Sequence, residues 1–273
     1  MSEDPRADAA PARSAAARPE SPESPRPQGP RSPEQLAARR RGAGDSAFEQ
    51  EARFGAALLR RHGWTLLLVF AGLLLPLWAF AELADDIHRQ ESLVYDVPVL
   101  EYAHGLSRHS LDLFFSVIAK LGYQWGVVPF DIVLVIALTA TRRFREASYA
   151  AIALAGSGLL NIAAKQFFAR ERPSLWESIA PEHNYSFPSG HAMGSMTLAA
   201  VLILLCWPTR WRWLVVAVMV PFTVLVGFSR LYLGVHYPSD ILAGWAVATA
   251  WAVAVYLLVY RGGLRRPWQA REG

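Results

Sequence analysis

The chain has 273 residues, of which 53% are hydrophobic and 18% charged, and its formal net charge is +4. Large apolar residues are scarce before residue 50 and fill long runs between residues 64 and 260, which excludes an ordinary soluble protein. A net positive charge is typical of proteins that bind nucleic acid or anionic lipid. The Arg residues cluster in short segments between apolar runs, so membrane topology explains them and no nucleic-acid partner is expected.

The chain begins with a polar segment. Residues 1–45 are rich in Pro, Ala, Arg, Ser and Glu, and we expect a disordered cytoplasmic tail because they lack the apolar surface that offsets ordering entropy. No apolar core of a secretory signal peptide follows Met1. Residues 46–62 place Phe and Leu among charges, which fits either an amphipathic helix at the membrane interface or a solvated juxtamembrane extension of the first span.

Six apolar runs predict an all-α integral membrane bundle of six transmembrane helices within residues 63–262. The apolar residues 111–120 are too few to span and predict a short helix at the outer surface. A cytoplasmic tail is expected over residues 263–273. The six predicted spans are residues 64–83, 121–140, 147–166, 191–207, 213–229 and 239–260.

The placement of Arg residues predicts the orientation of the bundle. Four groups of Arg fall on one side if there are six spans, and the positive-inside rule makes that side cytoplasmic, together with both termini. Residues 84–120, 167–190 and 230–238 then face the extracellular or periplasmic side of the plasma (inner) membrane. The four groups are Arg60 and Arg61; Arg142, Arg143 and Arg145; Arg210 and Arg212; and Arg261, Arg265 and Arg266.

A first polar cluster follows the pattern K-x6-R-P, from Lys165 to Arg172 and Pro173. Proline disfavours helix at the residue before it, so the helix that carries Lys165 should end by about Arg172, and both cations can converge on one anion. A snorkelling pair at the membrane interface is the alternative. Arg170 and Arg172 also lie in a predicted outer segment, where the positive-inside rule disfavours basic residues. Their presence there indicates a binding role unless they pair with acidic neighbours. Those neighbours are Glu171, Glu177 and Glu182.

A second cluster is P-S-G-H, residues 188–191. Ser189 is a good N-cap, Gly190 permits close backbone approach, and a helix that starts at His191 presents free N–H groups to a phosphate. A simple turn before a helix, without any phosphate-binding role, would have the same sequence pattern.

A third cluster is S-R-x5-H-x3-D, from Ser229 and Arg230 to His236 and Asp240. The His and Asp are one helical turn apart, so the carboxylate can accept a hydrogen bond from one ring nitrogen and leave the other free to attack. A histidine capped by a carboxylate at a helix start is the alternative.

All eleven motif positions, over a match of about residues 64–260, resemble the three motifs of the type 2 phosphatidic acid phosphatase superfamily, the lipid phosphate phosphatases. The resemblance implies His236 as the nucleophile of a phosphohistidine, Asp240 as its orienting acid, and His191 as the general acid and base. It assigns phosphate binding to the remaining polar positions and implies no metal or other cofactor. Those phosphate-binding residues are Lys165, Arg172, Ser189, Gly190 and Arg230.

The expected function is therefore a membrane phosphatase that hydrolyses a lipid phosphate or diphosphate at the outer leaflet. Candidate substrates are undecaprenyl diphosphate, phosphatidic acid, phosphatidylglycerophosphate and diacylglycerol diphosphate. A phosphotransferase would use the same residues, and an anionic-lipid transporter would use the same cations without needing His236 and Asp240 at helical spacing. Loop 174–187, with Trp176, Tyr185 and Phe187, is a candidate for head-group discrimination or an interfacial aromatic belt, and His183 is expected to be a loop residue.

Overall fold

The structure is a computed structural model that describes residues 63, 65–91 and 93–261. The chain divides into two units, Met1–Leu58 and Leu59–Gly273, and every described residue belongs to the second. The expectations for residues 1–45, 46–62 and 263–273 therefore lie outside the described residues.

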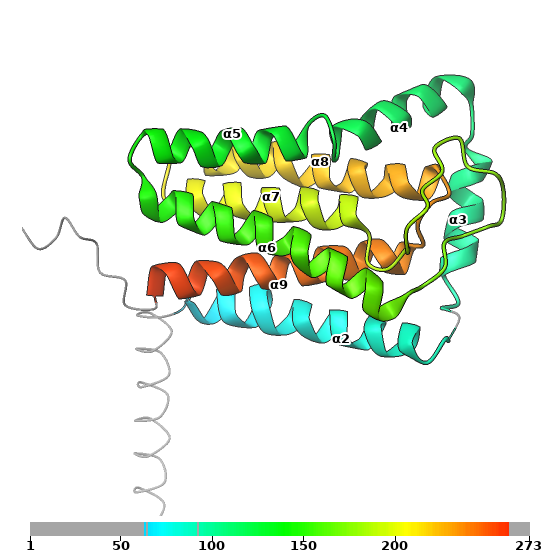
Figure 1. Cartoon of the computed structure of the whole chain (residues 1–273), viewed down its shortest axis with the longest axis horizontal. Helices are drawn as coiled ribbons and strands as arrows, with labels where there is room; N and C mark the ends of the chain where they lie inside the picture. Colours follow the sequence, from blue (N-terminus) through cyan, green and yellow to red (C-terminus); the bar gives the residue numbers. More distant parts are fainter. Residues whose placement is uncertain (1–62, 64, 92, 262–273) are drawn as a thin grey trace, which may run out of the picture. The chain divides into compact units, whose positions relative to one another are not determined.

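The described part of the chain is helical, with irregular connections and no strand (Figure 1). A π-helical stretch interrupts the first helix, which runs continuously from Thr65 to His88. The elements are η1 (Phe70–Leu74), α2 (Leu75–His88), α3 (Asp96–Gly105), α4 (His109–Leu121), α5 (Val127–Ala140), α6 (Phe144–Phe168), α7 (Gly190–Cys206), α8 (Arg212–Tyr232) and α9 (Pro238–Arg261).

Four described helices are long and apolar enough to cross a membrane, which supports a multi-pass membrane protein. They are Thr65–His88, Phe144–Phe168, Arg212–Tyr232 and Pro238–Tyr260. Two further apolar helices, α5 with 14 residues and α7 with 17, correspond to the other predicted spans. At 1.5 Å per residue they extend only about 21 and 26 Å, short of the roughly 30 Å hydrocarbon core. The count of six spans stays a prediction.

The second predicted span begins later than expected, at Val127 rather than at residue 121. Residues 122–126 form a turn, and α4 and α5 follow one another along the same side of the bundle (Figure 1). The helix expected over residues 111–120 is present as α4, which ends at Leu121. The short helix and the second span were thus expected as separate elements, and only the start of the span was misplaced.

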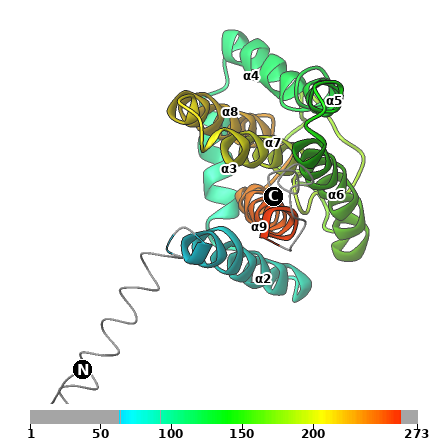
Figure 2. The same ribbon diagram turned by 90° about the vertical axis from the view of Figure 1, so that its left-hand side faces the viewer.

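Helix α7 lies in the middle of the bundle and packs against α5, α6, α8 and α9 (Figure 2). Small residues permit the close approach: a Cβ at Gly244 of α9 would lie 3.0 Å from the Ser189 carbonyl oxygen. A buried hydrogen bond of 2.7 Å joins the hydroxyls of Ser157 in α6 and Thr197 in α7. Such small and hydroxyl-bearing contacts are typical of helices packed in a membrane, and here they hold α7 against α6 and α9.

The polar end of the bundle is covered by α3 and by the irregular segment 169–189. Trp176 in this segment stacks on His104 of α3, with ring centroids 4.0 Å apart. The same indole lies against Gly234, where an added Cβ would be only 2.5 Å from Trp176 Nε1. Gly234 also has a φ of +69°, so both the space and the backbone conformation require glycine. The segment is thus held against both α3 and the α8–α9 connection.

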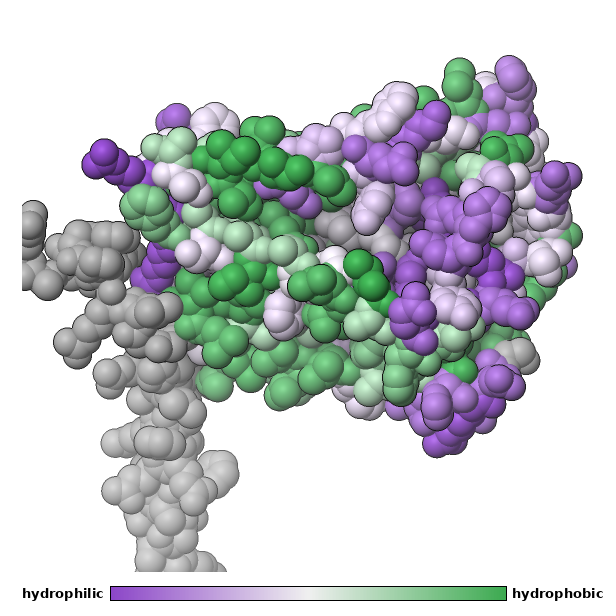
Figure 3. Space-filling view, viewed as in Figure 1, coloured by the Kyte–Doolittle hydropathy of each residue, from purple (hydrophilic) through white to green (hydrophobic). Residues whose placement is uncertain are grey.

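Apolar side chains cover the middle of the bundle, and polar side chains gather over α3 and segment 169–189 (Figure 3). Exposed apolar residues on the first helix include Phe70 and Trp78, at 65% and 63% exposure. A soluble protein rarely exposes so large an apolar surface, whereas a lipid-facing helix requires it.

Candidate active site

The candidate residues from all three motifs lie at one end of the bundle, where α6 and α8 end and α7 and α9 begin. Helix α6 ends at Phe168, with Ala169 in the left-handed conformation, so it stops before Arg172 as the proline predicts. The positions are Lys165 in the last turn of α6, Arg172 in segment 169–189, Ser189 to His191 at the start of α7, Arg230 in the last turn of α8, His236 between α8 and α9, and Asp240 in the first turn of α9.

The expected contact between His236 and Asp240 is present, and both side chains are fully buried. Nδ1 of His236 lies 3.3 Å from Oδ2 of Asp240, which also accepts the Tyr237 N–H at 2.9 Å. On the opposite edge of the ring, Nη1 of Arg172 lies 3.1 Å from Nε2. A guanidinium only donates, so Nε2 is the acceptor and Nδ1 carries the proton toward Asp240. Burial, followed by Arg172 and Arg230, lowers the pKa of His236 well below 6.5 and favours this neutral ring.

The carboxylate of Glu182 lies between the cations and the two histidines. Arg172 Nη2 donates to its Oε2 at 2.6 Å, and Arg230 Nη2 donates to its Oε1. The same oxygens lie 3.8 Å from His191 Nδ1 and 3.9 Å from His236 Nε2. Burial would raise the pKa of Glu182, but the surrounding cations, Arg230 first, lower it overall. Pairing of Arg172 with an acidic neighbour, one of the sequence alternatives, is therefore present.

Lys165 and Arg172 converge on a single neutral acceptor, whereas the first motif predicted convergence on one anion. Lys165 Nζ donates to Asn184 Oδ1 at 3.1 Å, and Arg172 Nη2 donates to the same oxygen. Lys165 is only 8% exposed, so it is held inside the site and does not reach the aqueous interface as a snorkelling residue would.

Arg170 takes no part in this convergence. Its guanidinium pairs instead with Asp96 of α3 at 2.8 Å and with Asp240 at 2.5 Å. Neither partner was among the acidic neighbours considered from the sequence, because Asp96 is distant along the chain and Asp240 already had a partner in His236.

The start of α7 has the predicted cap. Ser189 Oγ accepts the Ala192 N–H at 3.4 Å, and its own N–H donates to the Asp240 carbonyl at 3.0 Å. A Cβ at Gly190 would lie 3.0 Å from Asn161 Oδ1, which explains the glycine as a point of close approach. The N-terminus of α7, with its free N–H groups and partial positive charge, therefore joins the cationic cluster.

A cavity of about 510 Å³ opens beside these residues. It is lined from the α4–α5 turn by Tyr123 and Gln124, and His183 contributes from segment 169–189, consistent with its expected place in a loop. The other lining residues are Asn161, Lys165, Glu182, Asn184, Gly190 and His191.

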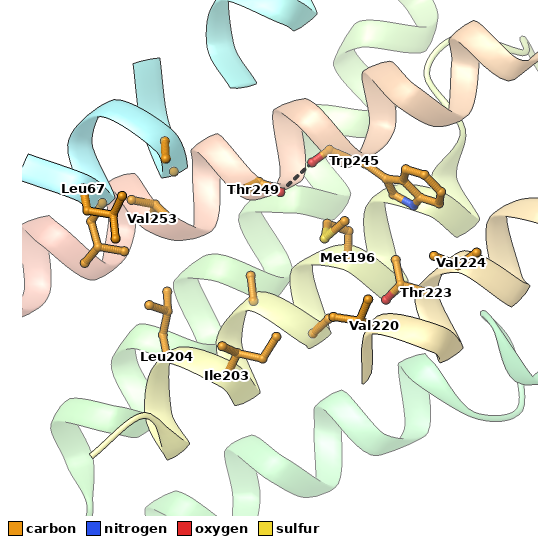
Figure 4. Close-up of a pocket in the computed structure, with 15 residues that line it drawn as sticks. Leu67, Met196, Ile203, Leu204, Val220, Thr223, Val224, Trp245, Thr249 and Val253 are labelled. Carbon is orange, nitrogen blue, oxygen red and sulfur yellow. Dashed lines mark hydrogen bonds between the residues drawn. The ribbon is translucent and has the colours of Figure 1, made fainter. Parts of the chain in front are cut away.

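A separate apolar pocket of about 350 Å³ lies between the first helix and α7, α8 and α9 (Figure 4). It contains none of the candidate residues; its lining includes Leu67, Met196, Val220 and Val253. The described residues hold no group of three or more His, Cys, Asp or Glu side chains placed to bind a metal ion.

Two aromatic residues of loop 174–187 do not line the cavity, which argues against a head-group role for them. Phe187 is fully buried and stacks on Phe80 at 6.0 Å, so it belongs to the core rather than to an interfacial belt or a head-group site. Trp176 packs on His104 and Gly234 and does not line the cavity. Their neighbours come from distant helices, which the local sequence does not reveal.

Comparison with known proteins agrees with this arrangement. A family model described as the PAP2 superfamily matches residues 146–263, which include all three motifs. The region that carries the three motifs therefore resembles the PAP2 superfamily. The chain is similar to a phosphatidylglycerophosphatase B of Bacillus subtilis, with 26% identity over 62% of this chain and 85% of that protein. An undecaprenyl-diphosphatase of Sulfolobus acidocaldarius is 42% identical, but the match spans only 24% of this chain and 30% of that protein.

Solved structures of PAP2 phosphatases share the fold. A crystal structure of a transmembrane PAP2-type phosphatidylglycerolphosphate phosphatase from Bacillus subtilis superposes with a TM-score of 0.62 at 24% identity, over 70% of this chain and 98% of that one. The structure of Aquifex aeolicus LpxE gives a TM-score of 0.52 at 25% identity, over 60% of this chain and 96% of that one. These likenesses show that the chain shares the fold of solved membrane phosphatases.

Proposed function

We propose that this protein is a PAP2 phosphatase, which hydrolyses a phosphomonoester or diphosphate of a membrane lipid through a phosphohistidine at His236. The observation that carries the proposal is the Glu182 carboxylate, an anion held by Arg172 and Arg230 within 4 Å of ring nitrogens of both His191 and His236. A phosphoryl group has the same charge sign and more oxygens, and it would take the place of this carboxylate.

The phosphoryl oxygens would be bound by the cations and by the start of α7. Lys165, Arg172 and Arg230 supply positive charge, and arginine's planar fork suits phosphate oxygens. The Nε–H of Arg230 is buried without a hydrogen-bond partner among the described residues, so it is available to a substrate oxygen. Gly190 would add its N–H at the helix start, and Ser189, whose N–H already donates to the Asp240 carbonyl, would add its hydroxyl. Charge that develops in the transition state is stabilised by the same groups.

The first chemical step is attack of the His236 Nε2 lone pair on phosphorus. A P–N bond forms while the bond from phosphorus to the leaving oxygen breaks, and His191 gives its proton to that oxygen. Asp240 balances the positive charge that His236 acquires, through Nδ1.

The second step returns the site to its starting state. His191, now neutral, takes a proton from a water molecule, whose oxygen attacks phosphorus as the P–N bond breaks. Inorganic phosphate is released, and the electron pair of that bond returns to Nε2 of His236.

The proposed substrates are those that the similar proteins' names suggest, undecaprenyl diphosphate and phosphatidylglycerophosphate, with phosphatidic acid as a third. The motif residues bind phosphate and do not choose among the lipid tails. The site would face the outer leaflet, because it lies at the opposite end of the bundle from the Arg-bearing turns at residues 141–143 and 207–211.

The test is phosphate release by purified protein in detergent, with EDTA present, from each of the three lipids. His236→Ala should reduce the rate by about 10⁴-fold or more while the helical content stays unchanged, since loss of a nucleophile removes the covalent route. Acid-quenched wild-type protein should carry acid-labile phosphate, which the variant should lack.

Hydrolysis at the wild-type rate by His236→Ala would refute the nucleophile assignment. Transfer of phosphate to a lipid or sugar acceptor without free phosphate would replace hydrolysis by phosphotransfer. Absence of any release from a folded protein would leave the cations as a binding site for an anionic lipid.

A further inference from the structure

Asp240 is held from two sides. Its Oδ2 faces His236 Nδ1 and accepts the Tyr237 N–H, and its Oδ1 accepts Arg170 Nη1 at 2.5 Å. Asp240 and His236 are fully buried. The guanidinium of Arg170 is in direct contact with the Asp240 carboxylate and balances its charge. A buried carboxylate without such a partner is unstable as an anion.

Arg170 is in turn held by α3. Its Nη2 donates to Asp96 Oδ2 at 2.8 Å, its Nη1 also donates to Ser239 Oγ at 2.8 Å, and its guanidinium lies 4.2 Å from the Tyr237 ring centroid. These contacts place the planar fork between two carboxylates, one from α3 and one from α9, and leave it little rotational freedom.

Asp96 is the first residue of α3 and is only 3% exposed. Its Oδ1 accepts the Ser239 N–H at 3.0 Å and its Oδ2 accepts the Ser239 hydroxyl at 2.6 Å. Asp96 therefore binds the first turn of α9 directly, as well as through Arg170. It lies outside the residues that the PAP2 family model matches.

We propose that Asp96 and Arg170 are positioning residues for the reaction, which hold Asp240 ionised and aimed at Nδ1 of His236. The inference rests on the proposed function, because it assigns these two residues a task in His236 attack. With Asp240 fixed as an acceptor, His236 keeps its proton on Nδ1 and its lone pair on Nε2. If Asp240 turned away or took up a proton, the ring could adopt the other tautomer, and its positive charge during attack would lose its partner.

A purely structural role, tying α3 to α9, is the competing interpretation, and the chain offers a matched comparison. Tyr232 of α8 donates its hydroxyl to Asp112 Oδ1 of α4 at 2.5 Å. This contact also joins an outer helix to a core helix, but it does not touch His236, Asp240 or Arg170. Tyr232→Phe therefore removes a comparable structural contact without disturbing the proposed relay.

The experiment compares Asp96→Asn, Arg170→Gln and Tyr232→Phe in the full chain, using the lipid that the wild-type protein hydrolyses. We expect Asp96→Asn to lower kcat about 10- to 100-fold and Arg170→Gln to lower it at least as much. Inhibition by inorganic phosphate should stay within about twofold of the wild type in both, because neither residue contacts the anion site. Tyr232→Phe should leave both quantities near their wild-type values.

A single-turnover measurement separates positioning from folding. The rate of phosphohistidine formation should fall in Asp96→Asn by the same factor as kcat, at a melting temperature no lower than that of Tyr232→Phe. If Asp96→Asn fails to fold, Arg170→Lys is the second variant: it keeps the charge but loses the fork, and it should have a kcat between the wild type and Arg170→Gln.

Wild-type kcat in folded Asp96→Asn and Arg170→Gln would overturn the inference. Weaker phosphate inhibition at unchanged kcat would also overturn it, since that result would place Arg170 in the anion site. An equal loss of kcat in Tyr232→Phe would reduce the network to a structural contact. Failure of the proposed function gives a different result, in which the wild-type protein itself forms no phosphohistidine and releases no phosphate.

Discussion

At the residue scale, the two ring nitrogens of His236 have different partners, and this difference defines the site. Arg172 can only donate to Nε2, and Asp240 accepts from Nδ1. The sequence predicted the second contact from a spacing of four residues. It did not predict the first, because Arg172 belongs to a segment whose irregular path has no periodic pattern.

The low pKa of His236 leads to a prediction about pH. Burial and the neighbouring arginines stabilise the neutral ring, so the competent form persists as the pH falls below 6.5 and is lost only when the lowered pKa is crossed. We expect kcat/KM to be bell-shaped, with the limb that reports protonation of His236 below pH 6.5. The measurement is a kcat/KM profile from pH 4 to 9 in detergent, with chemistry shown to be rate-limiting. An acidic limb above pH 6.5, or a flat profile, would contradict this assignment.

At the element scale, segment 169–189 supplies more of the site than its motif residues alone. Pro173 and the Ser189 cap predicted where the flanking helices end and begin, and α6 and α7 agree. Glu182 has no such local signal. It was considered only as an ion-pair partner for arginine, whereas the structure places its carboxylate beside both catalytic histidine candidates.

Glu182→Gln should strengthen inhibition by inorganic phosphate by about tenfold. The carboxylate competes with phosphate for Arg172 and Arg230, and an amide competes less well for two guanidinium groups. The measurement is the phosphate inhibition constant with the lipid that the wild type hydrolyses. Glu177→Gln, an exposed substitution in the same segment, is the control and should behave as the wild type. Unchanged or weaker phosphate inhibition in Glu182→Gln would show that this carboxylate does not compete for the anion site.

At the scale of the whole molecule, hydropathy predicted the helices that carry the motifs but missed two features. Residues 121–126 continue an apolar run, so the turn between α4 and α5 was absorbed into a span. Helix α3 is short, and the sequence offered no separate signal for it. Asp96 was missed for the same reason: its contact with Ser239 joins residues 143 positions apart, and only the packing of α3 on α9 brings them together.

The single cysteine of the chain allows a direct test of orientation. In a Cys206→Ser background, Ser174→Cys places a thiol in segment 169–189, and Thr209→Cys places one in the α7–α8 turn; both positions are exposed. We expect a membrane-impermeant maleimide to label only Ser174→Cys in intact cells and both variants after permeabilisation. The reverse pattern in intact cells would place the candidate site on the cytoplasmic side.

The boundary between the apolar surface and the polar end of the bundle has a kinetic consequence. The candidate phosphate-binding groups lie at the ends of the helices, beside the surface that lipid covers, so a substrate can reach them by lateral diffusion with its hydrocarbon chain still in the bilayer. Encounter then takes place in two dimensions. The rate should follow the mole fraction of substrate in the membrane or micelle, and diluting that surface with inert lipid should slow turnover even at constant bulk concentration.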